Sequence, residues 1–377
     1  MGRILILAHE HFVFQLPHPL DLAELCARDG HEVIVAAAFT DESRRWNVGR
    51  GFEIVQLADG RPMTNASFVW HALNVARRVR PDVVVGVNVL GFVATDLARR
   101  ARYTRHTAYY PMELSLPDEW PRSVSVRWQI EYARHTDLVF TTGRERAEEM
   151  QRRFELPSTP LAVANSPLRG PSGASGELRA RLRKAGFRHE RVILYTGSAG
   201  ENNGLLTAVA ASKLWKSDVG LAVQAFGGAP AFRTELERAV ADSDGRSILL
   251  PSLPGTRDDL LRYIAAADAG LVMFDHRADR SLNMLWYTPT KLFDYMSCGL
   301  PVIASDNPTL LQDVEALGWG ACCDPRDPVA IAAAVDRVFV DPKAMGRKAT
   351  ELFHGPFDFA KQSEEVRRRL TLLANGP

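Results

Sequence analysis

Lys291 and Asp294 are two charged residues whose types and spacing could do chemistry. Three residues apart near the start of a helix, they would project from the same side of the helix end. A helix N-terminus attracts anions through its free N–H groups and its dipole. Such an end could hold a phosphate near Lys291 while Asp294 accepts hydrogen bonds from sugar hydroxyls. For these two residues alone, an ion pair on the surface of an ordinary helix is the simpler interpretation, and it is favoured.

The segment around this pair predicts a helix that is followed at once by a buried strand. Leu292, Tyr295 and Met296 have the spacing of one apolar helix face. Gly299 is expected to end the helix, and the strand is expected to begin at Pro301.

A glycine-rich segment, residues 195–205, could bring the backbone close to a phosphate. Its sequence is Tyr-Thr-Gly-Ser-Ala-Gly-Glu-Asn-Asn-Gly-Leu, between an expected strand and an expected helix. It is not a GxGxxG fingerprint, and no acidic residue follows at the usual spacing of about 20 residues. A plain tight turn explains the segment equally well.

Two further candidates follow expected strands in the first half of the chain. His9, in the run His9-Glu10-His11, could orient an acceptor hydroxyl or act as an acid or base, with an exposed polar loop as the alternative. Glu113 comes just after the expected strand 107–110, where a carboxylate would point to the carboxyl edge of a parallel sheet. Its alternative role is to cap a loop. No spacing supplies a third ligand to these histidines, so no metal site is predicted.

Strand and helix signals alternate along the chain, which predicts parallel sheets covered on both faces. Helices are expected over residues 20–28 and 72–78. The expected strands of the first half are 3–8, 31–38, 52–57, 82–87, 107–110, 138–141 and 161–164. Those of the second half are 192–195, 220–226, 247–249, 269–274 and 301–304.

A stretch rich in proline, glycine and serine, residues 166–176, separates the two halves and is the expected linker. A chain of 377 residues is too long for one ordinary core, so two domains are expected. Two doubly wound domains would present the carboxyl ends of their strands to a shared cleft, where such sheets bind ligands.

Composition narrows the possible partners. With 46 basic and 45 acidic residues the net charge is +1, which gives no reason to expect a nucleic-acid partner. The basic runs 99–102 and 367–369 are expected to be solvated helix faces, with peripheral membrane contact as the most that they could support. No apolar run is long enough to span a bilayer, and the N-terminus is not expected to be a signal peptide. The four cysteines have no metal-binding spacing, and a reducing, cytoplasmic setting is predicted.

Together these segments resemble the retaining glycosyltransferases of GT-B fold and family 4 type, also described as glycosyl transferases group 1. Residues 288–303 carry the most specific likeness: a proline–small–lysine block, an acidic residue, and a Cys-Gly-x-Pro-Val-Ile turn. Supporting segments are 110–114, 195–205 and 262–272. The resemblance implies an α/β fold of two Rossmann-like, doubly wound domains facing a central cleft. It implies domains at 1–167 and 168–355, and a terminal helix in 356–377 that returns to the first domain.

The resemblance also implies roles for residues. Asp294 would bind the ribose of a nucleotide-diphosphate sugar, and the loop from Gly197 to Gly204 would approach the diphosphate. The acceptor, a small molecule, a lipid-linked sugar or a glycan, would lie near His9 and Glu113. Transfer to its hydroxyl would retain the anomeric configuration and need no metal or other cofactor. The expected catalytic residues are Lys291, Glu113 and His9, and the expected donor-binding residues are Asp294, Gly197, Ser198, Asn203, Gly204, Thr290 and Leu292.

The chain departs from the family pattern where cations are expected. Ser198 and Asn203 stand where the family often has an arginine and a lysine, and Trp286 stands in place of an upstream glutamate. Losing two cations beside a diphosphate removes charge stabilisation unless others substitute. Lys291, Arg277 and Arg280 are the available replacements, and Lys291 is the best placed. Two alternatives to a transferase therefore stay open: a non-catalytic partner subunit of GT-B fold, and a GT-B nucleotide-sugar epimerase or pseudo-glycosyltransferase.

Overall fold

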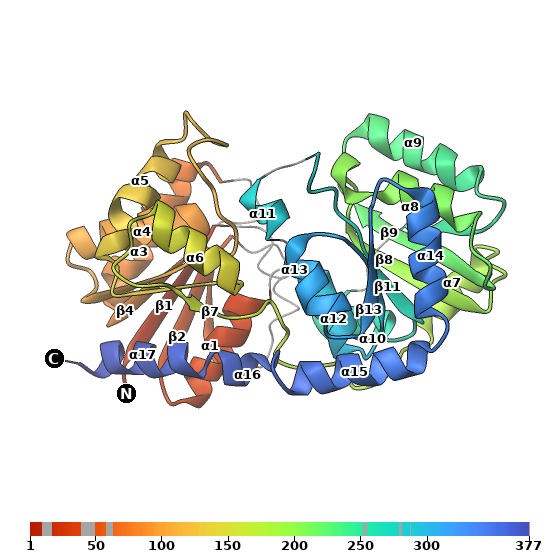
Figure 1. The fold of residues 1–377 in the computed structure, drawn as a ribbon. Coiled ribbons are helices and arrows are strands. Elements are labelled where there is room, and N and C mark those ends of the chain that lie inside the picture. Colours follow the sequence, from red (N-terminus) through yellow and green to blue (C-terminus); the bar gives the residue numbers. More distant parts are fainter. Residues whose placement is uncertain are drawn as a thin grey trace. The chain divides into compact units, whose positions relative to one another are not determined.

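The computed structural model describes residues 1–9, 17–38, 50–57, 63–251, 255–278, 281–286 and 288–376, which form two compact units. Unit 1 consists of Met1–Leu168 and Phe359–Pro377, and unit 2 of Arg169–Asp358 (Figure 1). The boundaries expected from the sequence, at 167 and 355, lie within a few residues of these.

Unit 1 contains a seven-stranded sheet in the order β3-β2-β1-β4-β5-β6-β7, and every neighbouring pair is parallel. The order reverses between β1 and β4, as in a doubly wound fold. The strands are β1 Arg3–Ala8, β2 Glu32–Ala37, β3 Glu53–Gln56, β4 Val83–Val87, β5 His106–Tyr110, β6 Leu138–Thr141 and β7 Leu161–Ala162.

Helices cover both faces of this sheet, because alternate side chains of each strand are apolar on both sides. Ile4 and Ile6 of β1 join a core with α1 and α17, whereas Leu5 and Leu7 join a second core with α3 and α4. The helices of unit 1 are α1 His18–Arg28, α3 Asn65–Val79, α4 Asn88–Arg100, α5 Val124–Tyr132, the 3₁₀ turn Ala133–His135, α6 Arg144–Arg153, α16 Phe359–Gln362 and α17 Glu364–Asn375.

Unit 2 repeats this architecture with a six-stranded sheet in the order β10-β9-β8-β11-β12-β13. Its strands are β8 Arg191–Ser198, β9 Val219–Phe226, β10 Ser247–Leu249, β11 Ala269–Val272, β12 Val302–Ser305 and β13 Gly320–Cys323. Its helices are α7 Glu177–Lys184, the 3₁₀ turn Glu201–Asn203, α8 Leu205–Ser212, α9 Pro230–Ala241, α10 Arg257–Ile264, α11 Leu282–Leu285, α12 Thr290–Ser297, α13 Pro308–Leu310, the π-helical turn Leu311–Glu315, α14 Pro328–Val338 and α15 Pro342–His354.

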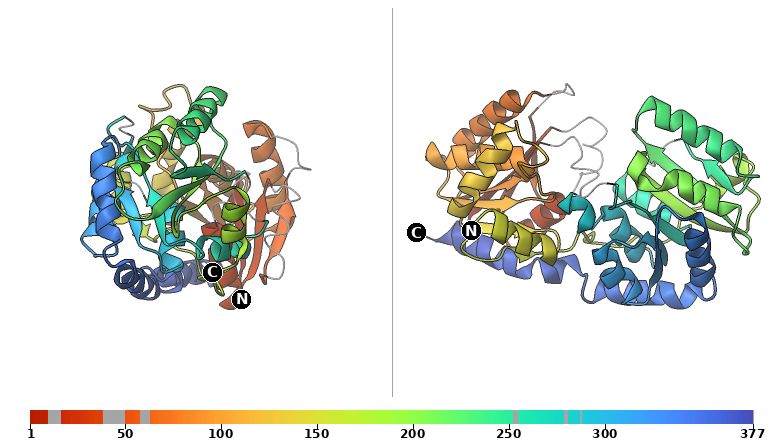
Figure 2. Two further views of the ribbon diagram at one scale, coloured as in Figure 1. Left: turned by 90° about the vertical axis from the view of Figure 1, so that its right-hand side faces the viewer. Right: turned by 45° about the horizontal axis from the view of Figure 1, so that its top comes forward.

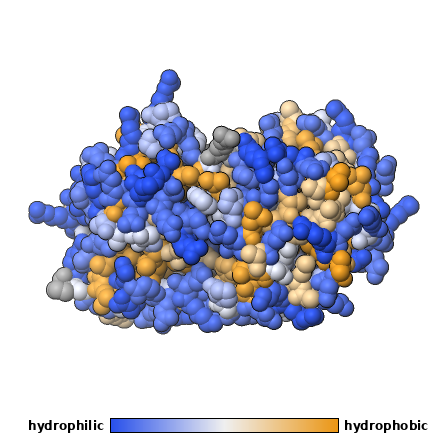
Figure 3. Space-filling view, viewed as in Figure 1, coloured by the Kyte–Doolittle hydropathy of each residue, from blue (hydrophilic) through white to orange (hydrophobic). Residues whose placement is uncertain are grey.

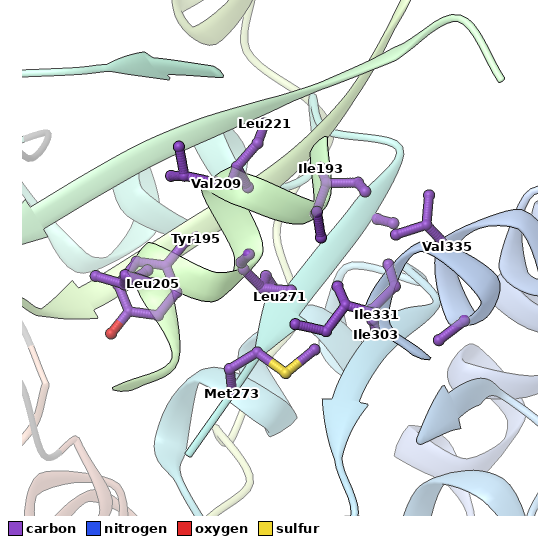
Figure 4. Close-up of a cluster of buried hydrophobic side chains, with 14 of the residues drawn as sticks. Ile193, Tyr195, Leu205, Val209, Leu221, Leu271, Met273, Ile303, Ile331 and Val335 are labelled. Carbon is purple, nitrogen blue, oxygen red and sulfur yellow. The ribbon is translucent and has the colours of Figure 1, made fainter. Parts of the chain in front are cut away.

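A continuous apolar core joins the sheet of unit 2 to the helices on one face. Ile193 of β8 and Leu271 of β11 pack against Val209 of α8 and Val335 of α14 (Figure 4). On the other face α12 lies very close to β11, since a Cβ added to Gly270 would come within 2.2 Å of the Tyr295 ring. This packing fixes the position of α12, which carries Lys291 and Asp294.

Both chain ends lie side by side in unit 1 (Figure 2). The amino group of Met1 donates a hydrogen bond of 3.1 Å to Oδ1 of Asn375 in α17. The face in Figure 3 is largely hydrophilic, with hydrophobic residues in small separate patches. Within the described parts of the chain, no helix combines the length and the apolar character needed to cross a membrane.

The doubly wound α/β prediction is confirmed in both units. Each strand expected from the sequence is present, with ends shifted by a few residues at most. β13 was not expected from the sequence, because its four residues Gly-Ala-Cys-Cys have little strand propensity and pair with β12 at the sheet edge. The basic runs are solvated helix faces: Arg99 and Arg100 pair with Asp96, and Arg368 and Arg369 pair with Glu365.

Candidate functional site

The glycine loop of unit 2 follows the carboxyl end of β8 and leads into α8. Gly197 has φ +150° and Gly204 has φ +59°, conformations that favour glycine. Gly204 ends the 3₁₀ turn and immediately precedes α8. The loop therefore has the backbone that the sequence pattern suggested, positioned at the ligand-binding edge of a parallel sheet.

Asn203 holds this loop together from within. Its side-chain amide donates hydrogen bonds to the Tyr195 hydroxyl at 3.1 Å and to Oγ of Ser198 at 3.2 Å. The Tyr195 hydroxyl in turn donates to the Ser198 carbonyl at 2.7 Å. Asn203 is 6% exposed, so its side chain is occupied in shaping the loop. Asn203 would therefore affect a bound donor indirectly, by holding the glycine loop in shape.

Lys291 lies in the first turn of α12, which begins at Thr290 directly after Pro289. Its Nζ is 4.0 Å from the centroid of the Tyr195 ring, a cation–π distance. A Cβ added to Gly197 would lie 2.5 Å from the same Nζ. Among the described residues, Lys291 has no carboxylate partner. The structure thus brings Lys291 and the glycine loop together, through contacts that their separation in sequence did not reveal.

Burial sets the protonation of Lys291. It lowers the pKa of this amine to about 7, and the negative charge of Asp294 opposes part of the shift. Lys291 as a whole is only partly buried, so the residue still reaches the surface. A lysine in this state can become fully charged when an anion binds beside it.

Asp294 is engaged by Arg257, a residue that the sequence analysis did not single out. The guanidinium donates from Nη1 to Oδ2 at 3.0 Å and from Nη2 to Oδ1, a bidentate pair. The Asp294 side chain is 6% exposed and that of Arg257 is 16% exposed. The surface ion pair with Lys291 that the sequence suggested is therefore wrong. No spacing rule pairs two residues that lie on different helices, α10 and α12.

The remaining residues expected to bind the donor differ in what they can offer. Leu292 is fully buried, so it can offer a ligand backbone groups alone. The N–H groups of Thr290 and Lys291 have no backbone acceptor within the described ranges, which is usual in the first turn of a helix. Ser198 is exposed at the end of β8.

Arg277 is not available as a replacement cation, because two carboxylates already surround it. It donates to both oxygens of Asp306, at 2.8 and 2.6 Å, and lies 3.8 Å from Asp324. Arg326 also binds Asp324 and lowers the pKa of that carboxyl to about 2. Arg280 lies outside the described residues. Lys291 is thus the one expected replacement that the described structure leaves without a carboxylate partner.

In unit 1, His9 and Glu113 follow strands β1 and β5, at the carboxyl edge of the sheet. The His9 ring packs edge-on against Phe68, with the ring centroids 4.9 Å apart. Glu113 is exposed and has no ion-pair partner within the described ranges. Glu10 and His11 lie outside those ranges.

Asn88 fixes the backbone before Glu113 and was missed by the sequence analysis. Its side-chain oxygen accepts hydrogen bonds from the N–H groups of Met112 at 2.7 Å and Glu113 at 3.4 Å. Asn88 has φ +52°, a left-handed conformation that asparagine tolerates better than most residues. An asparagine directly after a buried strand is the signal that could have drawn attention to it.

Two known families match the chain, one in each unit. Residues 18–166 match the family described as Glycosyltransferase Family 4, and residues 190–341 match Glycosyl transferases group 1. Together the matched ranges cover well over half of the sequence. The chain belongs to the family 4 type of glycosyltransferases. The likeness to the family 4 type, which residues 288–303 suggested most specifically, is thereby confirmed, and the chain is a glycosyltransferase by family. No curated protein matches it in sequence.

Solved structures share the fold at low identity. Sucrose-phosphate synthase from Thermosynechococcus elongatus has a TM-score of 0.71 and 18% identity, over 98% of this chain and 99% of that one. HepE of Anabaena, in complex with UDP-glucose, has a TM-score of 0.72 and 15% identity, over 98% of this chain and 100% of that one. A putative UDP-N-acetylglucosamine 2-epimerase from Listeria monocytogenes has a TM-score of 0.64 and 15% identity, over 98% of this chain and 96% of that one. These glycosyltransferases and this epimerase have one architecture, GT-B, which this glycosyltransferase shares.

Proposed function

We propose that this glycosyltransferase moves a sugar from a nucleotide-diphosphate sugar to an acceptor hydroxyl, with retention of configuration and without a metal. The observation that carries the proposal is the Lys291 amine at the start of α12, which lies against Gly197 and has no carboxylate partner among the described residues. An ammonium group and free N–H groups at one loop are suited to a diphosphate, whose charge grows as the sugar leaves. A bound UDP-glucose in HepE, a protein of the same fold, supports a donor of this class.

In this proposal Asp294 accepts hydrogen bonds from the ribose with the carboxylate lone pairs that Arg257 leaves free. Each carboxylate oxygen has two lone pairs, so a bidentate arginine does not exhaust them. His9 and Glu113 orient the acceptor hydroxyl at the carboxyl edge of the unit 1 sheet. The acceptor is a small molecule, a lipid-linked sugar or a glycan. The site uses no metal, so chelation with EDTA should leave the rate unchanged. The cysteines favour a cytoplasmic setting.

Nucleotide binding followed by turnover tests the proposal. In thermal-shift measurements with UDP, GDP, ADP and their sugars, the nucleotides of one base should raise the melting temperature of the protein. The sugar nucleotide of that base should then be consumed when an acceptor is supplied. An absence of nucleotide binding would refute it. The anomeric configuration of the product, measured by NMR, tests retention.

The same experiment separates the alternatives. Binding without donor consumption would favour a non-catalytic partner subunit, an alternative that the internal role of Asn203 and the serine at position 198 keep open. Conversion of the donor sugar without an acceptor would favour an epimerase, since an epimerase of the same fold is known.

A further inference from the structure

A groove with a volume of about 790 Å³ opens in unit 2 at the amino ends of β8, β11 and β12. Arg191, which lines it, is the first residue of β8, whereas Gly197 and Ser198 end the same strand. The groove is therefore at the opposite sheet edge from Lys291 and the glycine loop. Its other wall is the first two turns of α15, and Gly346 lets this helix approach Gly299 closely.

Three cations line this groove without a carboxylate partner in the described structure: Arg191, Lys343 and Arg347. The guanidinium of Arg191 is 4.8 Å from the Phe339 ring centroid, which holds it at the wall.

The two carboxylates in the lining are already engaged elsewhere. Asp268 binds Arg179 at 2.7 Å and accepts from the N–H of Val192 at 2.7 Å. Asp341 caps α15 by accepting from the N–H of Ala344 at 3.0 Å. The Asp341 carboxylate keeps its charge and offsets one of the three cations, whereas Asp268 is already paired with Arg179, so the groove keeps a net positive charge.

The two cations of α15 lie close together on the helix, and the N-cap carboxylate of Asp341 can balance the charge of one of them at most. Lys343 and Arg347 are four residues apart on one helix face, and like charges at this spacing repel. Lys343 also lies in the first turn, where the helix dipole disfavours a cation. By contrast, Lys348 on the same helix lies 3.5 Å from Glu351. A bound anion would relieve both repulsions at Lys343.

We propose that this groove binds a phosphate-bearing anion, separately from the nucleotide-sugar site. Arginine side chains match phosphate oxygens with paired N–H donors, and lysine adds a point charge. The anion is either free in solution, as a phosphate or diphosphate, or the headgroup of an anionic phospholipid. Both present charged phosphate oxygens to Arg191, Lys343 and Arg347.

Calorimetric titration of the full chain with inorganic pyrophosphate tests this site. Because pyrophosphate is also expected at Lys291, the titration is run in wild type and in Lys291→Ala. In Lys291→Ala, binding should remain, and adding Lys343→Gln with Arg347→Gln should weaken it by about tenfold or more, as expected for losing two charged contacts. Lys348→Gln, one residue away but outside the groove lining, is the matched control and should change nothing. Vesicles containing phosphatidylglycerol, compared with phosphatidylcholine alone, test the lipid source by co-sedimentation.

The outcomes are distinct. Loss of pyrophosphate binding when Lys343→Gln and Arg347→Gln are added to Lys291→Ala assigns the groove to free phosphates, and loss of vesicle binding alone assigns it to headgroups. Binding of both probes that the two groove substitutions leave unchanged in the Lys291→Ala background, or no binding of either probe, overturns the site. Equal pyrophosphate binding in wild type and Lys291→Ala would instead count against the donor site and leave the groove intact.

Discussion

The amine of Lys291 lies 4.0 Å from the centroid of the Tyr195 ring, in contact with the backbone of Gly197. The ring and the glycine belong to β8, and the lysine to α12, almost one hundred residues later. This relationship brings together two segments that are far apart in the sequence, the glycine loop and the first turn of α12, in an arrangement suited to an anion.

The protonation of Lys291 predicts a pH dependence of nucleotide binding. With a pKa of about 7 in the free protein, the amine loses its charge as the pH rises above 7. A bound diphosphate favours the ammonium and raises its pKa, so binding above pH 7 takes up a proton. The affinity for the nucleoside diphosphate should therefore fall between pH 7 and 9, by up to about tenfold per unit. Calorimetry at several pH values measures this.

Lys291→Ala is the control for this pH dependence. Its affinity should be lower than that of wild type at pH 7 and nearly flat from pH 7 to 9. The same slope in wild type and variant would assign the proton uptake to another group and contradict the role of Lys291.

The Arg257–Asp294 pair predicts a large effect on stability. Arg257→Ala leaves a carboxylate that is 6% exposed without its bidentate partner, which should cost about 3–5 kcal/mol of unfolding free energy. Urea denaturation measures the loss. Asp294→Asn in the Arg257→Ala background removes the stranded charge and should recover part of it. If the double variant is no more stable than Arg257→Ala, the loss does not come from the unpaired charge.

Gly197→Ala should impair the site more than the fold. The φ of +150° is strained for alanine, by about 1–2 kcal/mol, and the new Cβ would displace the Lys291 amine. We expect nucleotide affinity to fall by at least about tenfold, as it does on losing a charge-assisted contact. Gly176→Ala is the matched control, since its Cβ meets no atom within 4 Å and its φ is −73°. Equal effects of both substitutions on affinity would contradict the proposed contact.

Asn88 is expected to hold Glu113 in place for the acceptor. Asn88→Ala removes the acceptor for the N–H groups of Met112 and Glu113 and strains a residue with φ +52°, which should cost about 1–3 kcal/mol. Asn88→Gly keeps the backbone conformation and loses the hydrogen bonds alone. Comparing the two by denaturation separates strain from hydrogen bonding, and Glu113→Gln should lower turnover while leaving stability unchanged. A fully active Glu113→Gln variant would remove Glu113 from the catalytic set.

The positions of the strands, and of the helix that carries Lys291, follow from local patterns. Runs such as residues 83–87, all apolar or glycine, specify buried parallel strands, because each residue meets a helix on one face or the other. The end of α12 at Gly299 follows from one residue type that tolerates φ +66°. β13 could not be predicted in this way, because its short Gly-Ala-Cys-Cys run is held in the sheet by pairing with β12.

By itself the sequence determined the α/β class, the two halves, the helix that carries Lys291 and Asp294, and the likeness to a glycosyltransferase family. These depend on periodicity and on short motifs, which are local properties of the chain. The tertiary structure alone decided that Asp294 pairs with Arg257, that Asn203 ties the glycine loop together, and that the Lys291 amine lies over the ring of Tyr195. Such contacts join different elements, and their geometry exists once the sheet has brought the strand ends together.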